Sequence, residues 1–154
     1  MNKILVCFSA AILLLSCKKS ADDPTTTEIL VGAKWGLSKL TLESPLGNPP
    51  VDITLTTFKP CELDDIFEFK QDGSYTASEN TDVCVGSNNS VLYSLNGGNW
   101  SLSSGDSVLT IQKGLISQSF RFSKKTYNLI QIYQQQKNYL DQLVRYTYVL
   151  QVVK

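Results

Sequence analysis

The stretch from Ile66 to Ser78, which reads IFEFKQDGSYTAS, decides the fold. Apolar and polar side chains alternate on both sides of Asp72 and Gly73, and this period-two pattern is typical of strands that bury one face. The Asp-Gly pair supplies the positive φ values that a tight turn requires. The stretch therefore predicts a β-hairpin formed by residues 66–70 and 74–78.

The same arrangement recurs downstream, where residues 99–103 and 107–112 alternate around a turn that contains Gly105 and Asp106. Further alternating segments predict strands at residues 34–43, 51–58, 117–123, 127–134 and 143–153. Residues 134–138 are polar and predict a connection, and no segment predicts an amphipathic helix. In the first strand one face is expected to carry Trp35, Leu37, Lys39 and Thr41, and the other Gly36, Ser38, Leu40 and Leu42.

Eight or nine short strands at regular spacing indicate an all-β domain over residues 29–154. Consecutive hairpins indicate an antiparallel up-and-down meander, and closing it into a barrel of about eight strands would leave no exposed edge. A barrel is therefore the expected architecture. A two-sheet sandwich is the alternative, because alternation alone does not separate the two.

The N-terminal residues 1–16 have the features of a signal peptide. Lys3 precedes an apolar run over residues 4–15, which is too short to span a bilayer and has the length of a signal-peptide core. The sequence Leu14-Leu15-Ser16-Cys17 resembles the lipobox of bacterial lipoproteins, which implies cleavage before Cys17 and lipidation of its sulfur. Acyl chains there would hold the protein on a membrane. The alternatives are an ordinary secretory leader and a buried helix of a cytosolic protein.

Residues 17–28 follow as a polar segment with Pro24 and three consecutive threonines, and they predict a flexible tether. The charged residues after Cys17 resemble those of lipoproteins of the Bacteroidetes type. This resemblance implies the outer membrane of the cell envelope, with the domain either periplasmic or exposed on the surface.

Composition narrows the possible functions. The formal net charge is zero, so nucleic acid is not an expected partner. The chain contains no histidine, which removes the commonest general base and metal ligand. We therefore expect no enzyme and no cofactor, with carboxylate-based hydrolysis as the one catalytic alternative.

The order of several motifs carries a family resemblance. They are G-x-x-W at residues 32–35, CELDD at 61–65, F-x-F-x-x-D-G-S-Y at 67–75, G-x-W-S-L-S at 98–103 and V-L-T-I at 108–111. Together they resemble the lipocalin-like domains of Bacteroidetes lipoproteins, which implies a small antiparallel barrel with an apolar interior and no activity common to the family. The aromatic residues Trp35, Phe67, Phe69, Tyr75 and Trp100 are then candidate ligand contacts, and otherwise they are core.

Cys61 and Cys84 are the two cysteines that remain after the leader and Cys17. Export would place them in an oxidising compartment, where a disulfide is the expected outcome; a redox pair or half a zinc site are the alternatives.

The residues between these two cysteines include an acidic cluster, formed by Glu62, Asp64, Asp65 and Glu68. Calcium binding is conceivable there, but a solvated turn is the simpler interpretation, so no metal is expected.

Five tyrosines crowd the C-terminal third together with basic residues, a composition that suits carbohydrate or peptide recognition and also reflects strand propensity. They are Tyr127, Tyr133, Tyr139, Tyr146 and Tyr148, with Lys124, Lys125, Lys137 and Arg145.

The sequence thus predicts a monomeric, membrane-anchored, lipocalin-like protein that binds a small hydrophobic ligand or acts as an envelope interaction module. The alternative is a structural or adhesion lipoprotein without a ligand pocket.

Overall fold

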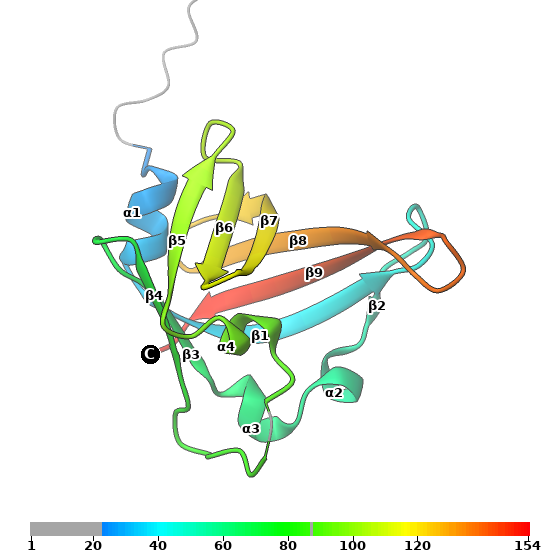
Figure 1. Cartoon of the computed structure of the whole chain (residues 1–154), viewed down its shortest axis with the longest axis horizontal. Coiled ribbons are helices and arrows are strands. Elements are labelled where there is room, and N and C mark those ends of the chain that lie inside the picture. Colours follow the sequence, from blue (N-terminus) through cyan, green and yellow to red (C-terminus); the bar gives the residue numbers. More distant parts are fainter. Residues whose placement is uncertain (1–22, 87) are drawn as a thin grey trace, which may run out of the picture.

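The computed structural model describes residues 23–86 and 88–154. Its strands form one antiparallel sheet that closes on itself, because β1 pairs with β9 as well as with β3 (Figure 1). Eight strands make the barrel, and the short β2 adds to β1, so the barrel prediction is confirmed over the sandwich. The strands are β1 (Lys34–Glu43), β2 (Val51–Asp52), β3 (Ile66–Phe69), β4 (Ser74–Ser78), β5 (Gly98–Ser103), β6 (Val108–Lys113), β7 (Ile116–Lys125), β8 (Leu129–Lys137) and β9 (Leu143–Val152).

The hairpin that decides the fold is present as β3 and β4, with Phe69 opposite Tyr75. Of the two turn residues only Gly73 has a positive φ, of 84°. Asp72 contributes differently, because its carboxylate accepts a hydrogen bond from the backbone N–H of Ser74 at 2.9 Å. The second hairpin, β5 and β6, is also confirmed.

The prediction of a strand over residues 51–58 is wrong beyond Asp52. The Asp52 carboxylate accepts a hydrogen bond from the backbone N–H of Thr54 at 3.0 Å, and helix α2 (Thr54–Thr57) begins there. Helix α3 (Pro60–Leu63) follows, with proline in its first turn, where a missing N–H has no consequence. Short polar side chains that bond to the backbone thus override the β propensity of this segment.

The expected faces of β1 hold only for its first half. A register shift between Leu37 and Lys39 inserts a β-bulge at Ser38, whose hydroxyl donates to the carbonyl of Val149 at 3.0 Å. After a bulge the alternation resumes one residue out of phase. Leu40 is therefore buried, whereas Lys39 is exposed, the reverse of the expectation for this half of the strand.

Three other expectations need correction. Helix α1 (Thr26–Val31), capped by Thr25 and Glu28, takes up the last residues of the expected tether. Helix α4 (Val91–Ser94) joins the loop after β4 to β5, so short helices do occur. Strand β8 runs on to Lys137 instead of ending near Gln134, because every residue from Leu129 to Lys137 pairs with β9.

Apolar side chains from all eight strands of the barrel fill its interior. The largest fully buried ones are Trp35, Phe67, Tyr75 and Phe120, and helix α1 adds Leu30 to the same core. Strands β1, β8 and β9 are among the longest and extend beyond the shorter strands (Figure 1). Their outward faces therefore offer a wide surface of side chains.

Candidate functional site

The five aromatic residues predicted to contact a ligand lie mainly in the core. Trp35, Phe67, Phe69 and Tyr75 are buried, and Trp100 is partly buried against them. Their polar atoms are satisfied within the domain: Trp35 Nε1 donates to the carbonyl of Leu30 at 2.9 Å, and the Tyr75 hydroxyl donates to that of Leu92 at 3.0 Å. These contacts are those of core residues, since a buried polar aromatic atom requires a partner.

A surface hollow includes one of the five, Phe69. It measures about 690 Å³ and lies between the end of α1 and the β3–β4 turn. Charged side chains border it, among them Lys34 and Glu68, which form a 3.0 Å ion pair. A hollow of this composition does not suit the small apolar ligand that the sequence predicts.

A second hollow lies across the outward faces of β1, β8 and β9, and we call it the outer groove. Its volume is about 350 Å³. Strands β1, β8 and β9 supply most of its lining, which comprises Lys39, Thr41, Glu43, Pro50, Ser123, Gln131, Tyr133, Arg145, Thr147 and Val149. Most of these side chains carry a hydroxyl, an amide or a charge, and their carbon atoms also give the groove a large apolar surface.

Strand register explains why these side chains gather. Thr147 on β9 lies opposite both Thr41 on β1 and Tyr133 on β8, and Tyr133 in turn lies opposite Arg121 on β7. Directly opposed residues share one face of a sheet with short side-chain separations. The bulge at Ser38 turns Lys39 and Thr41 to this outer face, so the groove depends on it.

Arg145 is the centre of the outer groove. Its guanidinium carbon lies 4.9 Å from the centroid of the Tyr133 ring, and its Nη1 atom lies 3.2 Å from Glu43 Oε2. Glu43 is itself fixed in position, because its other oxygen, Oε1, accepts a hydrogen bond of 2.6 Å from the backbone N–H of Gly47. The Nε atom of Arg145 is buried and has no hydrogen-bond partner among the described residues. The guanidinium is thus held in place, and because the Arg145 side chain is 35% exposed, a carboxylate from solvent can reach it.

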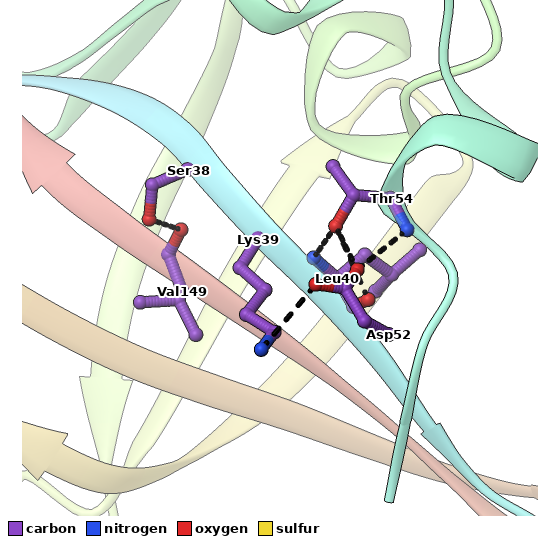
Figure 2. A network of polar contacts seen from close by, with 6 residues as sticks. All are labelled: Ser38, Lys39, Leu40, Asp52, Thr54 and Val149. Carbon is purple, nitrogen blue, oxygen red and sulfur yellow. Dashed lines mark hydrogen bonds and ion pairs between the residues drawn. The ribbon is translucent and has the colours of Figure 1, made fainter.

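One edge of the outer groove is fixed by the network in Figure 2. Lys39 Nζ lies 3.3 Å from Asp52 Oδ2, and Asp52 Oδ1 accepts a hydrogen bond of 2.6 Å from the Thr54 hydroxyl. That hydroxyl in turn accepts a hydrogen bond of 2.9 Å from the backbone N–H of Leu40. Hydrogen bonds from Thr54, chiefly from its hydroxyl, lower the pKa of Asp52, so the carboxylate stays charged beside Lys39.

The predicted acidic cluster does not form one site. Glu68 points away on β3 to pair with Lys34, whereas Glu62, Asp64 and Asp65 bind the connection between β4 and α4. Within the described residues, histidine, cysteine and carboxylate side chains do not assemble in groups of three that could hold a metal ion. These carboxylates therefore act as hydrogen-bond acceptors for a loop.

Glu62 and Asp65, two of the three carboxylates that bind this loop, are fully buried. Glu62 accepts the backbone N–H groups of Lys59 at 2.8 Å and Asn89 at 2.6 Å, and Asp64 accepts those of Thr81 and Asp82, both at 2.9 Å. Such bonds replace the backbone pairing that an irregular segment lacks. Desolvation of Asp65, reinforced by the nearby charges of Glu79, Asp64 and Glu62, raises its pKa to about 6.

Cys61 and Cys84 are brought together as predicted. Their sulfur atoms lie 2.09 Å apart, at disulfide distance, and their Cα atoms 5.3 Å apart. The pair joins α3 to the same connection that the carboxylates hold. It belongs to the fold and lies outside the outer groove.

The five tyrosines of the C-terminal third do not gather on one surface. Tyr146 and Tyr148 pack on the core side of β9, while Tyr127 and Tyr139 are exposed in the turns at either end of β8. Tyr133 alone of the five lines the outer groove. The sequence pointed to Tyr133 and Arg145 but missed Thr41, Glu43, Gln131 and Thr147, which only the pairing of β9 with both β1 and β8 could have indicated.

The predicted lipidation site, Cys17, lies outside the described residues. Within 23–86 and 88–154, no helix is both long and apolar enough to cross a bilayer. No protein-family model matches the chain, and no curated protein is significantly similar to it.

Proposed function

We propose that this chain is a lipid-anchored protein of the cell envelope whose barrel acts as an interaction module and binds its partner on its outer face. The observation that carries the proposal is the filled barrel interior, set against the groove outside it, which is lined by hydroxyl, amide and charged side chains. The module has no catalytic step, and its expected membrane is the outer membrane.

The filled interior argues against transport of a small apolar molecule inside the barrel. An eight-stranded barrel either fills with side chains or encloses one small ligand. Here Trp35, Phe67 and Tyr75 are fully buried and contact one another or their cross-strand partners, which places side chains where a ligand would sit. Binding would then require the core to open, which displaces well-packed aromatic groups.

The anchor is supported by the sequence around Cys17 and by the place where the domain begins. The capped helix α1 starts at Thr26, so eight residues, 18–25, separate Cys17 from the first helix of the domain. A tether of that length would keep the barrel close to the membrane while leaving its outer face accessible.

Fractionation of two cysteine variants tests the anchor. Full-length Cys17→Ser should leave the membrane fraction, because its sulfur can no longer be acylated. Cys7→Ser is the matched control, since it changes a leader cysteine outside the lipobox and should stay on the membrane. If Cys17→Ser remains membrane-bound after its leader has been removed, the anchor is wrong.

A fluorescent fatty-acid probe, 11-(dansylamino)undecanoic acid, tests the mode of binding. The full chain should show no saturable increase in dansyl fluorescence, because the barrel interior is occupied by side chains. Saturable binding that Trp35→Phe weakens would place a ligand inside the barrel and contradict the outer-face proposal.

A further inference from the structure

We propose that the outer groove binds an acidic polysaccharide, a polymer of sugar units that carry carboxylates. This inference rests on the proposed function and names the chemistry of its partner. It depends on the side chains that β1, β7, β8 and β9 present to the outside, and not on the barrel interior.

The charges on this face suit a polyanion. Its two acidic residues, Glu43 and Asp52, are each neutralised by an ion pair, with Arg145 and Lys39 respectively. Arg121 and Lys124 are exposed and form no ion pair with any described residue. The face therefore keeps an excess of positive charge, which attracts anions and strengthens their hydrogen bonds.

Arg145 offers a preformed contact for one carboxylate. Stacking on Tyr133 and pairing with Glu43 hold the guanidinium, and the Arg145 side chain is still 35% exposed to solvent. Arginine recognises carboxylates through two parallel N–H donors, and a guanidinium that is already fixed loses less entropy on binding.

The rest of the groove suits sugar hydroxyls. Thr41, Thr147 and Gln131 line it with groups that both donate and accept hydrogen bonds. Tyr133 also borders a neighbouring hollow of about 290 Å³, which includes Arg121. The two hollows meet at Tyr133, so a linear polymer can lie across both and contact Arg145 in one and Arg121 in the other.

An acidic peptide fits this face less well than a glycan. Extended peptides bind sheets mainly by adding a strand at an edge, where backbone groups are free. The barrel is closed between β1 and β9, and the outer groove lies on the face of those strands instead of at an edge. Only side chains are available on that face. A polymer rich in hydroxyls can bind through hydrogen bonds to side chains alone.

Titration of the full chain in mild detergent with polygalacturonate tests the proposal, with dextran as the neutral polymer and poly-glutamate as the acidic peptide. Arg145→Gln and Arg121→Gln should each weaken polygalacturonate binding by about tenfold, the value of one charge-assisted hydrogen bond. Arg121→Gln is needed as a second variant, because Arg145→Gln also leaves Glu43 without its ion pair, and a loss of binding in that variant alone would have two explanations. Lys70→Gln, which removes an exposed charge from the β3–β4 turn, is the matched control and should leave binding unchanged.

Binding of polygalacturonate well above that of dextran and poly-glutamate, with loss only in the two arginine variants, supports the proposal. Absence of binding, equal binding of either comparison polymer, or an equal loss in Lys70→Gln overturns it. None of these outcomes alters the membrane fractionation of Cys17→Ser or the fatty-acid titration, so failure here is distinguishable from failure of the proposed function.

Discussion

The Asp65 carboxylate accepts a 2.6 Å hydrogen bond from the side-chain amide of Asn88, twenty-three residues later in the chain. This contact joins the start of β3 to the connection between β4 and α4. Asp65 is fully buried, and its second oxygen, Oδ1, has no partner among the described residues. A buried carboxyl with one unsatisfied oxygen is more stable when protonated.

Stability should therefore fall as the pH rises. The pKa of Asp65 is raised from 3.8 to about 6 in the folded protein, so between these values the folded state binds more protons than the unfolded state. The free energy of unfolding should decrease from pH 4 to pH 7, by at most about 3 kcal/mol. Urea unfolding followed by tryptophan fluorescence at several pH values measures this change.

Asp65→Asn should remove most of that pH dependence and raise the stability at pH 7, because the amide keeps an oxygen for Asn88 and carries no charge. The exposed Asp23→Asn serves as the control and should keep the wild-type profile. A profile for Asp65→Asn that still falls between pH 4 and pH 7 would assign the effect to other groups.

The pairing of Cys61 with Cys84 should stabilise the domain. The two residues are 23 positions apart, and cross-linking a loop of this size contributes about 3 kcal/mol in the chain-entropy treatment. The double variant Cys61→Ser/Cys84→Ser should lose about that amount in urea unfolding. Reductant should destabilise the wild type to the same degree and leave the variant unaffected; a wild type insensitive to reductant would contradict the bond.

Thr54 should matter for stability through its hydroxyl. Thr54→Val keeps the shape of the side chain but leaves the backbone N–H of Leu40 without its 2.9 Å acceptor. An unsatisfied buried donor costs about 1 to 3 kcal/mol, which thermal or urea unfolding can resolve. Thr56→Val, an exposed site on the same helix, is the control and should change stability by less than about 0.5 kcal/mol. Equal effects at the two sites would refute a specific role for the Thr54 hydroxyl.

The hairpins of the barrel could be predicted because their information is local. Alternation around Asp72 and Gly73 specifies a hairpin within thirteen residues, and the same applies to β5 and β6. Helix α1 was missed because its signal is a short capping box between Thr25 and Glu28, which periodicity does not reveal.

The candidate site was less predictable because its information is long-range. Whether Lys39 or Leu40 faces outward depends on one bulge at Ser38, which no pattern in the sequence predicts. Whether Glu43 meets Arg145 depends on the pairing of β1 with β9, more than a hundred residues apart. The sequence contains the residues of the groove, but their meeting requires the closed sheet.

Helix α1 has a mechanical role if the chain is held at a membrane through Cys17. Any pull on the tether reaches the domain first at the capped start of α1, and Ile29 and Leu30 fix that helix in the core. The bond from Trp35 Nε1 to the Leu30 carbonyl passes the load from the helix to β1, and Lys125 Nζ shares it by bonding to the Thr26 hydroxyl from β7. In a protein anchored in that way, tension on the N-terminal end would be distributed over two strands, β1 and β7.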